Sequence, residues 1–229
     1  MNDMPKVLEP SSRPKAFHHV LHLKGPVESC EYYADWIDTI RNAGPEDSID
    51  FHINTPGGSV YTAIELMTAF AESQAQVNVI ISGLCASAGT MLMTVGDSFE
   101  IAPGTTFMFH NYSGGTIGKG NEMHVKMEYE RKWSKDFLHS VYEHVLTSEE
   151  IDQVLDGRDF WLPAEDVAER LTNLIEKRQM LMEEAMAEIE NAIKEAHDAE
   201  LEAAVKEAKE PKKKPAKRKP RKKATKKED

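Results

Sequence analysis

The stretch VNVIISGLCASAGTMLM, residues 77–93, joins two apolar runs through a turn of small residues. The first run is rich in β-branched residues and predicts a buried strand over 77–82, while the second predicts a helix over 87–95. Ser87 lies at the junction. A small polar residue between alanines and a glycine is most often a close-packing residue, but a serine at a strand-to-helix turn is also placed to act as a nucleophile. The rest of the chain decides between these two interpretations.

The alternation of strands and helices extends along the chain. Strands are predicted where apolar residues alternate or cluster, at 16–25, 47–54, 77–82, 98–102 and 105–110. Helices are predicted within 29–44, at 61–73, 87–95 and 121–146, and from Thr147 onward, where Glu150 completes a capping box. Strands separated by helices indicate βαβ units, so the expected fold class is α/β with a largely parallel sheet.

Composition shifts divide the chain into four predicted parts. Residues 1–15 are polar and proline-containing and are expected to form a flexible N-terminal arm, followed by a globular domain over 16–175. Residues 176–208 continue a segment rich in Ala, Glu, Lys and Leu, and are expected to form a charged helical extension. Its broken apolar stripe is compatible with a solvated helix and with a short coiled coil. Residues 209–229 lack apolar side chains beyond alanine and predict a disordered tail.

The formal net charge of −11 conceals a strong separation of charge. The tail holds 12 of the 28 Lys and Arg residues but 3 of the 39 Asp and Glu residues, a net of +9, which leaves −20 for the remainder. Such a tail is expected to bind polyanions in a salt-dependent way or to act as a solubilising end. No apolar run is long enough for a membrane span, and the N-terminus has no signal-like apolar segment, so the sequence predicts a cytoplasmic protein.

The chain contains two cysteines, Cys30 and Cys85, and no CxxC pair. Two cysteines do not make a disulfide framework, and both are expected to be small, reduced, buried residues. Cys85 lies two residues before Ser87, which gives it the same facing but a different location, so it is the weaker candidate nucleophile.

Three predicted strands end in residue types that suit acyl-transfer chemistry. One strand ends before Gly57-Gly58, one before Ser87 and one at His110. In open α/β sheets, functional groups gather at the carboxyl ends of strands. Consecutive glycines expose backbone N–H groups, as does the residue after the serine, and such groups stabilise an oxyanion. A histidine at a neighbouring strand end is placed to activate the serine as a base.

Four motifs in this order resemble the proteolytic subunit of the Clp protease (ClpP), a serine peptidase family of the crotonase-like superfamily. They are INTPGGSV, SGLCASAGTMLMTVG, FMFHNYSGGTIGKGNEM and GRDFWLPAEDV, and the likeness covers about residues 17–170. The resemblance implies a ClpP/crotonase-like spiral of βαβ units, with the 121–146 helix as a protruding handle. The helix and basic tail after about residue 176 have no counterpart in the ordinary member of the family.

The resemblance also implies roles for individual residues. Ser87 becomes the nucleophile, His110 the general base and Asp159 the carboxylate that orients His110. Gly58 and Ala88 become the oxyanion-hole donors. The glycine-rich connection or ribbon over 113–120 becomes the substrate-binding strand, through Gly114, Gly115 and Thr116. From residue logic alone, other aspartates compete with Asp159: Asp97, Asp136, Asp152, Asp156 and Asp166.

The expected function is therefore a serine endopeptidase that hydrolyses peptide bonds inside an oligomeric ring. The family implies a homo-oligomer, either a heptameric ring or a stacked double ring, that acts on polypeptide substrates without a cofactor or metal. A Clp-type ATPase partner is one expected setting. Capsid maturation, in the host cytoplasm if the chain is phage-encoded, is the other. Two alternatives are a catalytically silent scaffolding or assembly protein of the same fold, and an acyl-CoA-handling relative, which would lack the Ser-His-Asp set.

Overall fold

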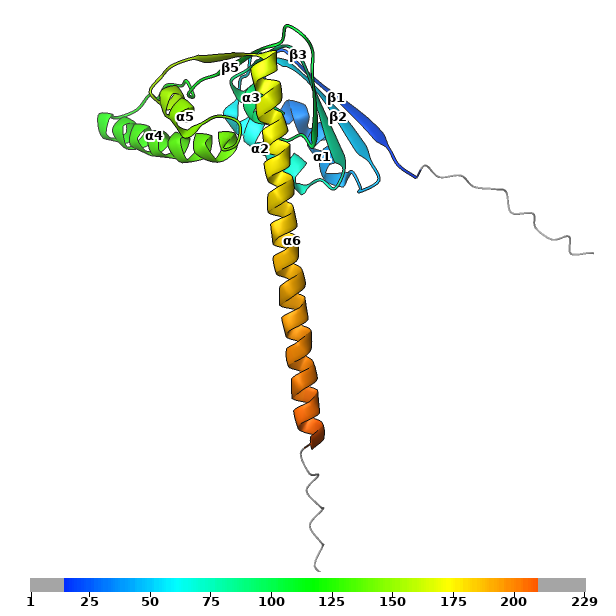
Figure 1. Cartoon of the computed structure of the whole chain (residues 1–229). Coiled ribbons are helices and arrows are strands. Elements are labelled where there is room, and N and C mark those ends of the chain that lie inside the picture. Colours follow the sequence, from blue (N-terminus) through cyan, green and yellow to red (C-terminus); the bar gives the residue numbers. More distant parts are fainter. Residues whose placement is uncertain (1–14, 210–229) are drawn as a thin grey trace, which may run out of the picture. The chain divides into compact units, whose positions relative to one another are not determined.

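The computed structural model of the 229-residue chain describes residues 15–209. The predicted N-terminal arm and basic tail therefore lie outside the described residues, apart from one residue of each. The chain forms two compact units that divide between Gln179 and Met180. The elements follow one another as labelled in Figure 1: β1 (His18–Lys24), η1 (Cys30–Tyr33), α1 (Ala34–Asn42), β2 (Ser48–Thr55), α2 (Val60–Glu72), β3 (Gln76–Ala86), α3 (Ala88–Met93), β4 (Ser98–Ile101), β5 (Thr106–Phe109), α4 (Gly120–Tyr142), α5 (Ser148–Leu155), β6 (Phe160–Pro163) and α6 (Ala164–Lys209).

A six-stranded sheet organises the first unit. Its strands follow the spatial order β1-β2-β3-β5-β6, and β4 pairs with β3 beside this path. The pairs β1–β2, β2–β3, β3–β4 and β3–β5 are parallel, and β5–β6 is antiparallel. The prediction of an α/β fold with a largely parallel sheet is confirmed.

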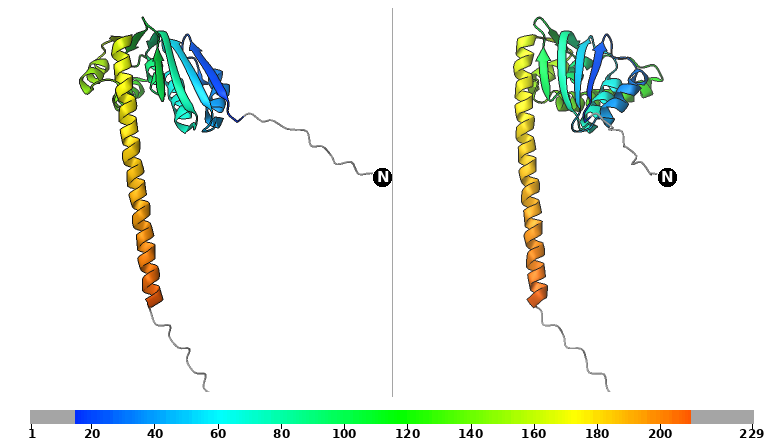
Figure 2. Two further views of the ribbon diagram at one scale, coloured as in Figure 1. Left: turned by 45° about the vertical axis from the view of Figure 1, so that its right-hand side comes forward. Right: turned by 90° about the vertical axis from the view of Figure 1, so that its right-hand side faces the viewer.

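One face of the sheet carries the core. Alternate residues of β2 and β3, among them Phe51, Ile53 and Val79, are fully buried, which is the period-two pattern of a strand with one covered face. The helices α1 and α2 bury Ile40 and Leu66 in the same cluster. The right-hand view of Figure 2 looks onto the opposite face of β1, β2 and β3, which no helix within residues 15–179 covers.

Four details differ from the sequence-based expectations. β3 runs beyond residue 82 to Ala86, because its last residues pair with β5 after its first residues have paired with β4. β6 was not predicted, since four residues offer too little periodicity. Residues 111–119 form no strand, so the segment is a connection and not a paired ribbon. Cys30 is exposed, against the expectation of burial, while Cys85 is buried as expected.

The first turns of α6 belong to the first unit and pack on it. Val167, Leu171 and Leu174 are buried there, and the Arg178 guanidinium donates to the backbone oxygens of Thr94 (2.7 Å) and Gly96 (3.2 Å). Considered by itself, the second unit continues α6 from Met180, and its side chains are exposed as far as residue 201. No helix within residues 15–209 is both long and apolar enough to cross a membrane.

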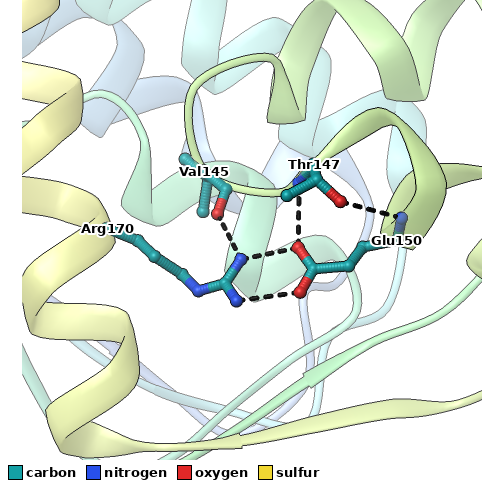
Figure 3. A network of polar contacts seen from close by, with 4 residues as sticks. All are labelled: Val145, Thr147, Glu150 and Arg170. Carbon is teal, nitrogen blue, oxygen red and sulfur yellow. Dashed lines mark hydrogen bonds and ion pairs between the residues drawn. The ribbon is translucent and has the colours of Figure 1, made fainter.

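A partly buried ion pair connects α6 to the start of α5. Both guanidinium nitrogens of Arg170 donate to the Glu150 carboxylate, at 2.6 and 2.8 Å, and Arg170 also donates to the Val145 oxygen at 2.9 Å (Figure 3). The same carboxylate accepts the Thr147 N–H at 2.8 Å, while the Thr147 hydroxyl accepts the Glu150 N–H at 3.2 Å. The predicted capping box is therefore confirmed, and Glu150 both caps α5 and holds Arg170.

Replacement of Arg170 by Met is predicted to lower the free energy of unfolding at pH 7 by about 1.5–3 kcal/mol, because hydrogen bonds to charged groups contribute that much. The Arg170 hydrogen bonds lower the pKa of Glu150 from its ordinary 4.5. A lowered folded-state pKa stabilises the fold above about pH 4.5, and this stabilisation is lost as the pH falls through the folded pKa. The difference in unfolding free energy between wild type and Arg170→Met should therefore become smaller in acid. Urea denaturation at pH 7 and pH 3 measures both effects.

The matched control is Arg41→Met. Arg41 pairs with Glu72 at 2.7 Å, but both side chains are largely exposed, and such pairs contribute at most about 1 kcal/mol. Equal losses of unfolding free energy in the two variants would contradict the assigned role of the Glu150–Arg170 pair. So would a difference between wild type and Arg170→Met that does not change with pH.

Candidate active site

The carboxyl ends of three parallel strands meet at one edge of the sheet. β2 ends at Thr55 before Gly57-Gly58, β3 ends at Ala86 before Ser87, and β5 ends at Phe109 before His110. Because neighbouring parallel strands point the same way, the residues that follow them are brought to the same edge. The structure thus brings together three of the features singled out in the sequence.

Ser87 occupies a strained turn between β3 and α3. Its backbone angles are φ 55° and ψ −125°, a region that L-amino acids rarely adopt. Its N–H donates to the Met108 oxygen (2.8 Å), and its C=O accepts both the N–H (2.8 Å) and the hydroxyl (2.7 Å) of Thr90. Both polar groups of the Ser87 backbone are therefore anchored, and surrounding structure holds the serine in a conformation it would not adopt alone. A serine on such a strand-to-helix turn is the arrangement of a nucleophile elbow.

The Ser87 and His110 side chains are in direct contact. His110 Nε2 lies 2.7 Å from Ser87 Oγ, within hydrogen-bond distance, and both residues are half-buried. When the imidazole is neutral and accepts at Nε2, its Nδ1 carries the proton. A serine hydroxyl that donates to a neutral imidazole is positioned to lose its proton to that imidazole as it attacks an electrophile.

The Gly57-Gly58 loop lies against the Ser87 turn. A Cβ added to Gly57, whose φ is +93°, would lie 2.5 Å from the Ser87 Cβ and 3.0 Å from the Ala88 nitrogen. A Cβ added to Gly58, whose φ is +151°, would lie 2.3 Å from the Val27 oxygen. The loop thus lies between two backbone segments, and only glycine fits at positions 57 and 58.

Two backbone N–H groups beside Ser87 are without hydrogen bonds in the described part of the chain. The Gly57 N–H donates to Thr55 Oγ1 (3.0 Å), and Val27 pairs with the flanking Gly57 and Ser59 backbone. The N–H groups of Gly58 and Ala88 have no partner within residues 15–209. These are the two groups that the resemblance assigns to an oxyanion hole, and both N–H groups are available to donate hydrogen bonds to an oxyanion.

The β5–β6 ladder ends next to His110 and Asp159. Phe109 pairs with Phe160 at the end of this antiparallel ladder, so a continuation of the register by one residue would bring Asp159 opposite His110. The Asp159 side chain is exposed, and within residues 15–209 it makes no hydrogen bond with His110 and no ion pair within 4.0 Å. Among the competing aspartates, Asp97 accepts the Val77 N–H and Asp152 lies 3.4 Å from His139, so neither contacts His110.

The remaining predicted site residues lie in the connection between β5 and α4. Gly114 and Gly115 are exposed and Thr116 is half-buried, and the three form no ladder with another strand of the described chain. Cys85 is fully buried, and burial raises the pKa of its thiol, so it is unsuited to nucleophilic attack. No group of three or more potential metal ligands occurs within the described residues.

Sequence reasoning missed the residues that support the loop and the turn. Thr55 Oγ1 fixes the Gly57 N–H, and the Thr55 Cγ2 would lie 2.4 Å from a Cβ on Gly89. Val27 bridges Gly58 from a segment about 30 residues earlier in the chain. Neither residue carries a chemical signal in the sequence, because one acts through a hydroxyl-to-backbone bond and the other through its backbone.

A parallel sheet with a serine on a strained turn, in contact with a histidine directly after the neighbouring strand, is an arrangement typical of serine hydrolases. Comparison with known proteins gives the family. A model of the Clp protease family matches residues 34–177, and the chain belongs to that family.

Two curated relatives show how low the sequence identity to this chain is. The ATP-dependent Clp protease proteolytic subunit 1 of Salinibacter ruber is 28% identical over 134 residues, which are 57% of this chain and 57% of the relative. The ATP-dependent Clp protease proteolytic subunit of Bacteroides fragilis is 26% identical over 139 residues, 60% of this chain and 64% of the relative. The chain thus spans about three-fifths of the length of these relatives.

Replacement of Gly57 by Ala is predicted to lower the rate at which a fluorophosphonate labels Ser87 by about 100-fold, because a displacement of about 1 Å at a reacting centre costs that much. The added methyl group would overlap the Ser87 Cβ and the Ala86 oxygen. The measurement is the second-order labelling rate of the folded variant.

Gly104→Ala controls for backbone strain. Gly104 also has a positive φ, +77°, but a Cβ there meets nothing within 4 Å. Both variants should lose about 1–2 kcal/mol of stability from the left-handed conformation, and labelling should fall only for Gly57→Ala. A similar loss of labelling in both would show that strain, and not contact with Ser87, is responsible.

Proposed function

We propose that the protein is a serine endopeptidase that hydrolyses peptide bonds through Ser87, His110 and Asp159. The observation that carries the proposal is the 2.7 Å contact between Ser87 Oγ and His110 Nε2 at a strained strand-to-helix turn. Membership of the Clp protease family supports the same reaction class. A scaffold that had lost its chemistry would have no need to maintain this contact together with the backbone strain at Ser87.

In the proposed reaction, Ser87 Oγ attacks the scissile carbonyl carbon while His110 Nε2 takes its proton. The carbonyl oxygen becomes an oxyanion that accepts hydrogen bonds from the Gly58 and Ala88 N–H groups, which are unoccupied in the described chain. His110 then donates the proton to the departing amine. Water then attacks the acyl-enzyme while His110 Nε2 takes its proton. His110 returns that proton to Ser87 Oγ as the carboxylic acid product leaves, which regenerates Ser87.

Asp159 is proposed to accept a hydrogen bond from His110 Nδ1. Its position opposite His110 in a continuation of the β5–β6 register supports this role, although its carboxylate is turned to solvent. A rotation of the exposed side chain, with no change of the strand pairing, would complete the triad. We propose that assembly with other copies of the chain favours this rotation by removing the carboxylate from water, which strengthens its hydrogen bond to the imidazole.

Oligomerisation is supported by the surface of α4. Val125, Met127 and Tyr129 are each at least 60% exposed, which is unusual for neighbouring large apolar side chains on one helix. We propose that these residues contact another subunit in a ring or stacked double ring. Residues Gly114–Thr116 are proposed to pair with an extended substrate, because an exposed unpaired segment beside the site can accept a strand. A Clp-type ATPase partner and a role in capsid maturation are the two proposed settings.

The test is labelling of the purified full-length protein with a fluorophosphonate, together with measurement of its mass by light scattering. Wild type is expected to be labelled and Ser87→Ala is not. Absence of labelling in wild type, on a particle many times the monomer mass, would contradict the enzymatic proposal and support the silent scaffold.

Asp159→Asn is predicted to reduce peptide cleavage by about 10²–10⁴-fold, because an orienting carboxylate stabilises the imidazolium that forms during attack. Asp156→Asn provides the control, since Asp156 is exposed three residues earlier at the end of α5. Steady-state cleavage of a fluorogenic peptide measures the effect. Equal activity of the two variants would remove Asp159 from the mechanism.

Deletion of residues 209–229 is predicted to leave peptide cleavage unchanged, because the proposed chemistry uses residues 58–159. The same deletion should weaken binding to heparin or DNA, since it removes 12 of the 28 Lys and Arg residues. Binding of the full-length chain should decrease as salt rises. Loss of peptide cleavage in the truncated chain would show that the tail contributes to the fold or the assembly.

A further inference from the structure

Tyr142 is a fully buried tyrosine that the proposed reaction does not use. It is the last residue of α4, and its hydroxyl lies 2.7 Å from Thr90 Oγ1. Its ring packs edge-to-face on Phe109, with centroids 5.3 Å apart and an interplanar angle of 78°. Phe109 directly precedes His110, and Thr90 binds the Ser87 carbonyl. One side chain therefore contacts the supports of both members of the Ser87–His110 pair.

The direction of the hydrogen bonds follows from the number of available protons. Thr90 has one hydroxyl proton, and the Ser87 carbonyl oxygen at 2.7 Å is able only to accept. The Thr90 oxygen is then left as an acceptor, so the Tyr142 hydroxyl is the donor in their shared contact. The result is a chain of two hydrogen bonds, from Tyr142 through Thr90 to the Ser87 backbone. Burial raises the pKa of Tyr142, so the phenol retains the proton that this chain needs.

This chain completes the restraint on the Ser87 peptide groups. On one side, the Ser87 N–H is held by Met108 of β5. On the other, the Ser87 C=O is held by Thr90, whose hydroxyl is in turn oriented by Tyr142. A buried phenol hydroxyl without a hydrogen-bond partner would destabilise the fold, and the hydrogen bond to Thr90 avoids this loss of stability. Hydrogen bonds in such a chain polarise one another, so each strengthens the next.

We propose that Tyr142 is a positioning residue that sets the relative placement of Ser87 Oγ and His110 Nε2. It acts through Thr90 on the serine turn and through Phe109 on the strand that carries the histidine. The inference rests on the proposed function and adds a coupling to it: the placement of the end of α4 and the geometry of the Ser87–His110 pair change together.

The test compares Tyr142→Phe, Thr90→Val and the double variant in the full-length chain. Tyr142→Phe keeps the ring against Phe109 and removes only the hydroxyl. The double variant removes both hydroxyls of the Tyr142–Thr90 hydrogen bond. No buried hydroxyl is then left without a partner, so the double variant should be as stable as wild type. The readout is fluorophosphonate labelling of Ser87, resolved into the maximal rate constant and the half-saturating concentration, with urea denaturation to monitor the fold.

Thr94→Val is the matched control. Thr94 is buried and follows the last residue of α3, and its hydroxyl donates to the Met91 oxygen three residues earlier at 2.8 Å, as Thr90 donates to Ser87. It differs from Thr90 in that its hydroxyl contacts neither Tyr142 nor Ser87. Thr94→Val therefore reports what the loss of one buried helical hydroxyl does to labelling through stability alone.

The maximal labelling rate is expected to fall about 10-fold in Tyr142→Phe with the half-saturating concentration unchanged, because a poorly placed nucleophile reacts slowly once the reagent is bound. The double variant should lose little more than either single variant, since both act through one chain. Labelling of Tyr142→Phe at the wild-type rate would overturn the inference, as would an equal loss in Thr94→Val. Failure of wild type itself to label Ser87 would instead contradict the proposed function, and the inference with it.

Discussion

The pairing of β3 with β5 is the constraint on which the site depends. β3 pairs with β4 through Ile81 and then with β5 from Leu84, and the hydrogen bond from the Ser87 N–H to Met108 continues this second ladder past the end of the strand. The register fixes how far Ser87 and His110 each extend beyond the sheet. A slip of one residue would turn the His110 side chain to the other face, because side chains alternate along a strand. The 2.7 Å contact between Ser87 Oγ and His110 Nε2 therefore depends first on the register of β3 and β5.

Close backbone approach is the second requirement, and it explains the small residues around Ser87. Gly57 has no room for a side chain beside the Ser87 Cβ, and Gly89 has none beside Thr55. These contacts bring the Gly57-Gly58 loop against the Ser87 turn, where the N–H groups of Gly58 and Ala88 have no hydrogen-bond partner within the described residues. The site is thus lined by backbone groups whose direction is set by packing, which makes its donors more rigid than side chains would be.

Side-chain contacts between helices support the elements that flank this edge of the sheet. Tyr142 anchors the end of α4 to α3, and the Glu150–Arg170 pair anchors α5 to α6. β6 lies between α5 and α6 and pairs with β5, so the position of Asp159 depends on these anchors and on the β5–β6 register. Its carboxylate, in contrast, is held by nothing in the described chain. The strand register fixes the backbone positions of Ser87 and His110, while the Asp159 side chain is exposed to solvent.

The sequence alone predicted the α/β class, a largely parallel sheet and the two residues, Ser87 and His110, that the structure brings into contact. Long periodic segments such as 61–73 and 121–146 carry their own signal, and Ser87 and His110 stand where strands end. Asp159 was identified only by resemblance to the Clp protease family, because an aspartate on a short strand has no distinguishing pattern. The four-residue β6, the support of the Gly57 loop by Thr55 and Val27, and the contacts of Tyr142 were decided by tertiary structure. The Val27–Gly58 bridge and the Thr90–Tyr142 contact join residues 31 and 52 positions apart through backbone and hydroxyl groups, and nothing in local periodicity or residue type encodes such a contact.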